Sequence, residues 1–435
     1  MNKPLTEDVL LQNMRDMDIE QISKATIRQA VALSASLEKI LGEPFSRLEI
    51  GVPGLDPCRE GVEAQKRALD SGIASVYPSI EGLPALKEAA SRFIKAFVNI
   101  DVDPKCIVPT VGSMQGSYNL TLECSQLRPG RDTMLYIHPG FPANLTQARV
   151  LGVRHEAFDI YEYRGEKLRD KLESYFATGR IAAILFSNPN NPTWVCLTEE
   201  ELQIIGELAN KYDVIVLEDM AYMCMDFRTD LSHPFEAPFQ PTVARYTDNY
   251  IIMLSASKIF SYAGERIALV AFNNKLFRRQ FEGLRERYGI ARMGQNFIHT
   301  FLYAASSGTS HSAQYAMAAM LQGAADGTLP FVHNVSEYGR RAKIVKELFI
   351  KHGFHIVYDH DMDRPIADGF FFTAGYGDMD DETLMRCLMR CGISSIGLNT
   401  TGSGQYGVRV CVSALRTDAD FQRLDERLAM FASEF

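Results

Sequence analysis

Several short apolar runs are each followed by residues that could bind a ligand or move a proton. Residues 181–186 lead into Ser187-Asn188-Pro189-Asn190-Asn191-Pro192-Thr193, residues 214–217 into Glu218-Asp219 with Tyr222 close behind, and residues 251–254 into Ser255-Ala256-Ser257-Lys258. A charge against a buried strand is costly, so Asp219 and Lys258 call for a function. The run ending at Val111 leads into Gly112-Ser113-Met114, where the free N–H groups of a helix start would favour a phosphate. Taken singly, each segment also fits an ordinary turn or a solvated strand end.

The same apolar runs predict the elements that position these residues. Residues 134–137, 181–186, 214–217, 251–254 and 267–272 are continuously apolar, which is typical of strands buried on both faces of a parallel sheet. Thr198 with Glu201 three residues later predicts a capping box and an amphipathic helix. Strands alternating with helices predict an α/β fold, whose ligands bind beyond the carboxyl ends of the strands.

The pattern changes after about residue 328. A helix-like stretch through Tyr338, Ala342 and Val345 precedes short strand-like runs at residues 355–358, 369–373 and 408–413, which predicts a smaller α+β domain. We therefore expect an N-terminal arm and part of the small domain in residues 1–55, a large α/β domain in 56–327, and the rest of the small domain in 328–435.

Composition limits the classes of function. The chain has 435 residues, 46% of them hydrophobic, and a net charge of -9, so neither nucleic acid nor a membrane surface is an indicated partner. Eight dispersed cysteines, several within apolar runs, are interpreted as reduced core residues of a cytoplasmic protein. Cys387 and Cys391 are the only pair near ligand spacing and lack a second pair, so we expect no metal. Neither a secretory start nor an apolar run of about 18 residues is present.

Taken together, the motifs resemble those of a known family. Asn188-Pro189-Asn190-Asn191-Pro192-Thr193, Asp219 with Tyr222, and Ser255-x-Ser257-Lys258 with Arg266 eight residues further on resemble the signature of the class I/II aminotransferases. Order and spacing both match, from Gly51-Val52-Pro53-Gly54 to Arg409. The resemblance implies pyridoxal 5′-phosphate (PLP) as cofactor and fold type I of the aspartate aminotransferase superfamily. That fold is a mostly parallel central sheet sandwiched by helices, with a smaller α+β domain from both chain ends.

The resemblance also implies roles for individual residues around the PLP ring. Lys258 would form the Schiff base with PLP and move the proton during catalysis. Asp219 would stabilise the protonated pyridine nitrogen, while Tyr222 and Asn191 would bond to the ring 3′-oxygen. Phe141 would stack on the ring. Catalysis is thus assigned to Lys258, Asp219 and Tyr222.

Phosphate and substrate binding are assigned in the same way. The phosphate would be bound by Gly112, Ser113, Met114, Ser255, Ser257 and Arg266. Tyr77 would reach the phosphate of the neighbouring subunit, which implies a homodimer with shared active sites. Arg409 would bind the α-carboxylate of the substrate, with Asn191 and Gly51 in the same site.

The implied activity is transfer of an amino group from an L-amino acid to a 2-oxo acid, by a ping-pong mechanism through pyridoxamine phosphate, in amino-acid metabolism or biosynthesis. C–S lyases and cyclopropane-forming synthases use the same lysine apparatus, and sequence motifs do not separate them. A PLP-binding regulatory domain is a third alternative. It would need a basic DNA-binding module before Gly51, where the scattered Lys and Arg residues form no recognition-helix cluster.

Two departures from the family pattern leave questions open. Trp194 stands where the family has a glycine, so the geometry of this turn is in doubt. It could narrow the substrate choice from a place near the site or the dimer interface, or be a bulky residue of a surface turn. Residues 399–404 form an unusual segment before Arg409. No partner for a distal side-chain carboxylate is evident, and the amino donor and acceptor are not identified.

Overall fold

The computed structural model describes residues 3–435, and the chain forms two compact units. Unit 1 comprises residues 1–55, 191–195 and 336–435, of which residues 1 and 2 lie outside the described part. Unit 2 comprises residues 56–190 and 196–335. Unit 1 is therefore built from three separate stretches of the sequence.

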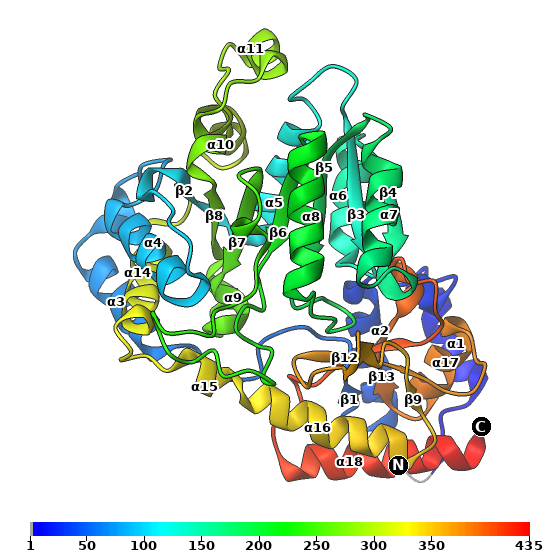
Figure 1. Cartoon of the computed structure of the whole chain (residues 1–435). Coiled ribbons are helices and arrows are strands. Elements are labelled where there is room, and N and C mark those ends of the chain that lie inside the picture. Colours follow the sequence, from blue (N-terminus) through cyan, green and yellow to red (C-terminus); the bar gives the residue numbers. More distant parts are fainter. Residues whose placement is uncertain (1–2) are drawn as a thin grey trace. The chain divides into compact units, whose positions relative to one another are not determined.

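Unit 2 contains a seven-stranded sheet with the order β2-β8-β7-β6-β5-β3-β4 (Figure 1). Its strands are β2 (Ile107–Val111), β3 (Thr133–His138), β4 (Arg154–Asp159), β5 (Ile181–Ser187), β6 (Ile215–Asp219), β7 (Tyr250–Ser255) and β8 (Ile267–Phe272). Pairing is parallel from β7 through β4, whereas β8 is antiparallel to both β2 and β7. The five apolar runs fall in β3, β5, β6, β7 and β8, which confirms the predicted strands and the mostly parallel sheet.

The reversed direction of β8 decides where its first residues lie. Val111 pairs with Ile267, and Ser255 pairs with Ala268. The start of β8 therefore shares an edge with the carboxyl ends of β2 and β7. Arg266, which directly precedes β8, lies at the edge where ligands of such sheets bind.

Helices of unit 2 separate most of the successive strands of the sheet, as in an α/β fold, and others precede β2 or follow β8. They are α3 (Arg59–Asp70), α4 (Pro84–Val98), α5 (Gly112–Cys124), α6 (Pro142–Leu151), α7 (Glu166–Phe176), α8 (Glu199–Tyr212), α9 (Ala256–Ile259), α10 (Asn274–Arg278), α11 (Glu282–Tyr288), α12 (Met293–Asn296), α13 (Tyr303–Ala305), α14 (His311–Ala325) and α15 (Phe331–Val335). A π-helical stretch, Phe297–Leu302, joins α12 to α13. The capping box predicted at Thr198 and Glu201 is present at the start of α8, and Leu202, Ile205 and Leu208 are buried as expected.

Unit 1 combines elements from both ends of the chain. Its helices are α1 (Glu7–Asp16), α2 (Ile27–Leu41), α16 (Glu337–Lys351), α17 (Asp381–Arg390) and α18 (Asp418–Glu434). A four-stranded sheet has the order β14 (Ile396–Gly397), β15 (Val408–Cys411), β12 (Phe371–Gly375) and β9 (His355–Ile356). Two further pairs are β1 (Ser46–Arg47) with β13 (Ile393–Ser394), and β10 (His360–Asp361) with β11 (Arg364–Pro365). The parallel pairing of β1 with β13 joins the N-terminal and C-terminal segments of this α+β unit (Figure 1).

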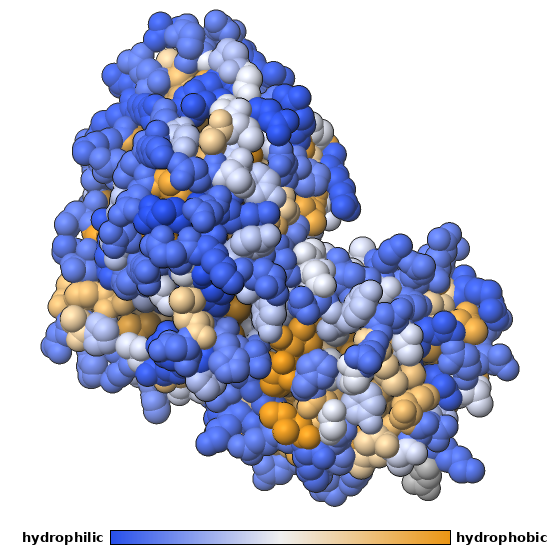
Figure 2. Space-filling model, turned by 45° about the vertical axis from the view of Figure 1, so that its right-hand side comes forward, coloured by the Kyte–Doolittle hydropathy of each residue, from blue (hydrophilic) through white to orange (hydrophobic). Residues whose placement is uncertain are grey.

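The surface is mainly polar on the face that Figure 2 draws, where hydrophobic residues gather in small groups. Across residues 3–435, none of the helices is both long enough and apolar enough to cross a membrane.

Candidate functional site

The first corner of the candidate site lies where β2 enters α5. Gly112 has a φ of +66°, and a Cβ atom at this position would lie 2.5 Å from Nη2 of Arg266. Only glycine combines this backbone conformation with so close a guanidinium. Beside it, the buried Oγ of Ser113 has no hydrogen-bond partner within the described chain. An arginine, a helix N-terminus and an unsatisfied hydroxyl together suit a phosphate group.

The second corner follows β7. The buried Oγ of Ser255 accepts a hydrogen bond from the backbone N–H of Ser257 at 3.2 Å and so caps the short helix α9. Lys258 lies on α9 and is half-buried. Because Ser255 pairs with Ala268 at the start of β8, this segment and Arg266 lie at the same sheet edge.

Asp219 ends β6 and carries an unbalanced carboxylate. Its Oδ1 accepts a hydrogen bond from the backbone N–H of Ala221 at 3.0 Å, and no ion pair joins it to a cation anywhere in residues 3–435. Burial raises the pKa of this carboxyl to about 6, and the bond from Ala221 offsets part of that rise. A buried carboxylate at a strand end fits a cationic ligand such as a protonated pyridine nitrogen.

Two other predicted cofactor residues lie on turns of unit 2, whereas Asn191 belongs to unit 1. Tyr222 is buried three residues beyond Asp219, and Phe141 is the half-buried N-cap residue of α6, after β3. Nδ2 of Asn190 donates a hydrogen bond to the carbonyl of Pro139 at 2.9 Å, which ties the turn after β5 to the turn that carries Phe141. The sheet edge of unit 2 thus offers groups of the types needed for the PLP phosphate, ring nitrogen and aldehyde.

Three predicted residues of unit 2, Met114, Tyr77 and Arg266, are exposed. Met114 is 38% exposed on the first turn of α5. Tyr77 is 92% exposed and lines a cavity of about 500 Å³, together with Val76, Pro78 and His311. Within residues 3–435, Tyr77 forms no hydrogen bond or ion pair with the other predicted cofactor residues.

Arg409 is the centre of a polar arrangement in unit 1. It is only 2% exposed on β15, and its guanidinium donates hydrogen bonds to the backbone carbonyl of Glu49 at 2.6 Å and to Oδ1 of Asn191 at 3.3 Å. The guanidinium carbon lies 4.6 Å from the centroid of the Phe371 ring. A rigid two-pronged cation held in this way is suited to bind a carboxylate.

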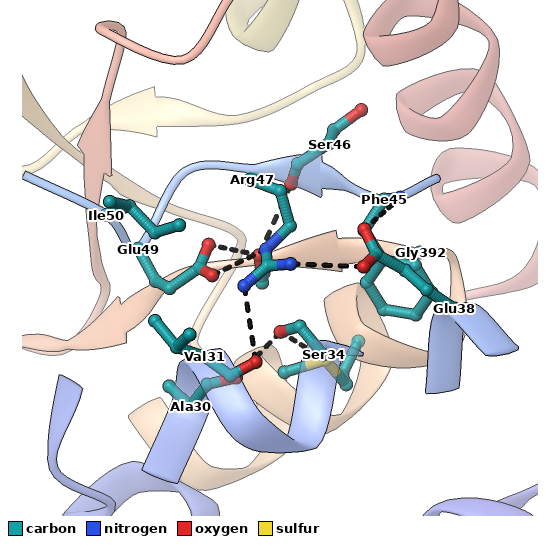
Figure 3. A network of polar contacts seen from close by, with 12 residues as sticks. Ala30, Val31, Ser34, Glu38, Phe45, Ser46, Arg47, Glu49, Ile50 and Gly392 are labelled. Carbon is teal, nitrogen blue, oxygen red and sulfur yellow. Dashed lines mark hydrogen bonds and ion pairs between the residues drawn. The ribbon is translucent and has the colours of Figure 1, made fainter. Parts of the chain in front are cut away.

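A charge network that the sequence analysis missed supports the Glu49 segment (Figure 3). The fully buried carboxylate of Glu49 accepts a hydrogen bond from Nε of Arg47 at 2.6 Å and another from Ser394. Arg47 also donates to Glu38 at 3.1 Å and to the carbonyl of Val31 at 3.2 Å, both on α2. The only sequence signal was a glutamate placed between two aliphatic residues. The network fixes the segment after β1, in which the carbonyl of Glu49 accepts a hydrogen bond from Arg409.

Trp194 is not a residue of a surface turn. Its side chain is completely buried, and its backbone has a φ of +65°, in the left-handed region that favours the glycine seen in the family. The indole lies edge-on to Phe371, with the ring centroids 6.2 Å apart. The surface-turn alternative is therefore wrong, and the turn has a left-handed conformation that is strained for a tryptophan.

Hydrogen bonds hold residues 399–404, the unusual segment before Arg409, at both ends. Leu398–Thr401 forms a 3-10 turn, and the carboxylate of Asp381 accepts hydrogen bonds from the N–H groups of Asn399 at 2.6 Å and Gly407 at 2.7 Å. Tyr358 and Ser403 are joined through their hydroxyls at 2.6 Å. The predicted substrate residue Gly51 lies in the same unit, where a Cβ atom would be 3.5 Å from the Phe371 ring.

Cysteines and metal ligands add no further site. All eight cysteines are free, and seven of them are buried. Residues 3–435 contain no cluster of three or more His, Cys, Asp and Glu side chains that could hold a metal ion.

Comparison with curated proteins gives partial matches. The aspartate aminotransferase of Pyrococcus horikoshii is 26% identical over 259 residues, which cover 59% of this chain and 62% of that protein. The aromatic-amino-acid aminotransferase 2 of Thermococcus litoralis is 30% identical over 206 residues, 47% of this chain and 50% of that protein. The matches thus span about half to three fifths of these relatives.

The fold and family are shown more broadly. The solved aspartate aminotransferase of Thermus thermophilus with maleate has a TM-score of 0.73 at 19% identity, covering 97% of this chain and 98% of that one. An aminotransferase from Mycobacterium tuberculosis has a TM-score of 0.75 at 16% identity, covering 94% and 96%. These similarities confirm fold type I. A sequence model of the family "Aminotransferase class I and II", whose cofactor is PLP, matches residues 44–428. The chain therefore belongs to the class I and II aminotransferase family.

Proposed function

We propose that this protein is a PLP-dependent transaminase, which moves an amino group from an L-amino acid to a 2-oxo acid. The observation that carries the proposal is the buried carboxylate of Asp219, which has no cation partner in the described chain and lies at the same sheet edge as Lys258. A protein gains nothing from an unbalanced buried charge unless a ligand balances it. The family match and the aminotransferase names of the curated relatives support this activity.

Each part of the chain has a defined task in this reaction. PLP, when bound, supplies the electron sink and carries the amino group between the two substrates. Asp219 would keep the pyridine nitrogen protonated, and Ser113, Ser255, Ser257 and Arg266 would hold the phosphate. The amine of Lys258 would take and return the proton on the substrate α-carbon. Arg409 would hold the α-carboxylate, so that the reacting carbon is presented in one orientation.

The proposal includes a homodimer and a cytoplasmic location. The 92% exposure of Tyr77 supports the dimer, because an exposed tyrosine beside a cavity is suited to a contact with a second copy. The eight free cysteines support a reducing compartment.

The test is the absorbance spectrum of the purified protein with PLP, recorded before and after single L-amino acids are added without any oxo acid. The proposal expects a visible band that one amino acid converts to a near-ultraviolet band, and that a 2-oxo acid restores. Release of ammonia or a thiol in place of this reversible change would indicate an elimination enzyme. The absence of a visible band would refute the assignment of Lys258.

A further inference from the structure

Trp194 has a backbone conformation that is unfavourable for a bulky residue. A bulky residue at a φ of +65° is strained, so the burial of its side chain must offset that strain. The indole is completely buried, although it belongs to a five-residue stretch, residues 191–195, inserted between two segments of unit 2. The contacts of this buried indole determine which neighbouring residues it holds in place.

The space for the indole is provided by a glycine. A Cβ atom on Gly369 would lie 1.9 Å from Cε2 of Trp194 and 2.1 Å from its Nε1, distances that no packing adjustment accommodates. The backbone of Gly369 does not itself require glycine, because its φ lies outside the left-handed range. Gly369 is thus needed for the tryptophan and not for the chain conformation.

The indole reaches Arg409 through Phe371. Trp194 meets Phe371 edge-on, with an interplanar angle of 63°, and the face of Phe371 lies 4.6 Å from the guanidinium carbon of Arg409. In the antiparallel pair of β12 and β15, Thr373 is opposite Arg409 and Phe371 is opposite Cys411. Phe371 is therefore a diagonal neighbour of Arg409 on the same face of the sheet. The Phe371 ring can orient the guanidinium of Arg409 only if a neighbouring side chain holds the ring in place.

The same tryptophan also holds a second contact of Arg409. Asn191, whose Oδ1 accepts a hydrogen bond from Arg409, lies three residues before Trp194 in the inserted stretch. Burial of the indole anchors that stretch in unit 1. Two of the three contacts described for the Arg409 guanidinium, those with the Phe371 ring and with Asn191, thus depend on the buried position of Trp194.

We propose that Trp194 is a positioning residue for the substrate carboxylate, acting on Arg409 through Phe371 and through the stretch that carries Asn191. The inference rests on the proposed role of Arg409 and deepens it. The carboxylate site of this chain depends on an aromatic support that the family's usual glycine could not provide, and Trp194 and Gly369 form one functional pair.

The test is a double-mutant cycle on the PLP-loaded full-length protein, with pyruvate as the probe and calorimetry to measure its dissociation constant. Trp194→Gly and Gly369→Ala are each expected to raise this constant about 10-fold, and the double variant is expected to be no weaker than Trp194→Gly alone, because the two share one contact. The inference is overturned if the double variant raises the dissociation constant by the product of the two single effects. It is also overturned if Trp194→Gly leaves the dissociation constant unchanged.

A second pair of variants covers the case in which Trp194→Gly does not fold. Trp194→Phe retains an aromatic ring and is expected to bind pyruvate within about 3-fold of wild type, whereas Trp194→Leu should lose about 10-fold. Equal binding by these two variants overturns the inference. Phe354→Leu, in an aromatic cluster of unit 1 with Phe349, Tyr376 and Phe431, is the matched control and should bind as wild type does.

Kinetics add a readout that general loss of structure would not give. With the amino acid found to convert the wild-type spectrum, Trp194→Leu should raise KM much more than it lowers kcat, with the visible PLP band still present. If wild-type protein binds neither pyruvate nor an amino acid, the proposed carboxylate site itself fails and the inference fails with it. If wild type binds and Trp194→Leu binds equally, only the inference fails.

Discussion

Asp219→Asn should change the way in which the stability of the cofactor-free protein depends on pH. Burial raises the pKa of Asp219 from an ordinary value of 3.8 to about 6. The unfolded chain therefore releases this proton at lower pH than the folded chain, and the native state loses stability as pH rises from 3.8 through 6. The loss of stability between pH 4 and pH 8 amounts to roughly 2 kcal/mol. The asparagine variant should lack this loss.

The assay is urea unfolding of the cofactor-free protein, followed by circular dichroism at pH 4, 6 and 8. Glu218, whose pKa burial raises to about 8, contributes a further loss to wild type and variant alike, so it cancels in the difference between them. Asp170→Asn, an exposed aspartate on α7, is the matched control and should leave the pH dependence unchanged. With PLP bound, wild type should not show the loss, because a cation beside the carboxylate favours its charged form. Parallel curves for wild type and Asp219→Asn without cofactor would refute this account of the buried carboxylate.

Three further results are expected. Lys258→Ala should abolish turnover and the visible band while the circular dichroism spectrum stays unchanged; substantial remaining activity would remove the lysine from its assigned role. Arg409→Ala should raise the KM of the amino acid roughly 100-fold with the PLP band retained, because charged hydrogen bonds to the carboxylate are lost, and an unchanged KM would move the carboxylate site elsewhere. Arg47→Ala should lower the free energy of unfolding by roughly 3 kcal/mol, since it removes a cation from the buried Glu49; Arg15→Ala, on the exposed face of α1, should have little effect in the same denaturation experiment.

The fold of unit 2 was predictable because its strands are buried on both faces. A continuous run such as residues 251–254 has no other stable placement, and the capping box at Thr198 marks where the next helix begins. β4 escaped prediction because it lies at the sheet edge, where Arg154–Asp159 can be largely polar. The apolar pattern gave no sign of the reversed direction of β8, since antiparallel and parallel central strands are equally buried.

Residues of the site were predictable only where a chemically reactive side chain directly follows a predicted strand. Asp219 and Lys258 each follow a buried strand, so their sheet edge could be inferred from sequence. Glu49 acts through contacts with Ser394 and Arg409, which lie more than 300 residues further along the chain, and Phe371 meets Trp194 from a different segment. Such long-range pairing leaves no local periodicity. The strain at Trp194 could be anticipated from sequence, but the glycine that receives its indole could not.

The chain has a single tryptophan, and it lies in the shortest of the three stretches that build unit 1. Its burial requires Gly369 and Phe371, which ribosomes add almost 180 residues later. Intrinsic tryptophan emission therefore reports one step of folding, the packing of the C-terminal segment against residues 191–195. Emission should stay red-shifted until that segment is in place, even where the sheet of unit 2 has already formed. Comparison of this signal with circular dichroism would show in which order the two units assemble.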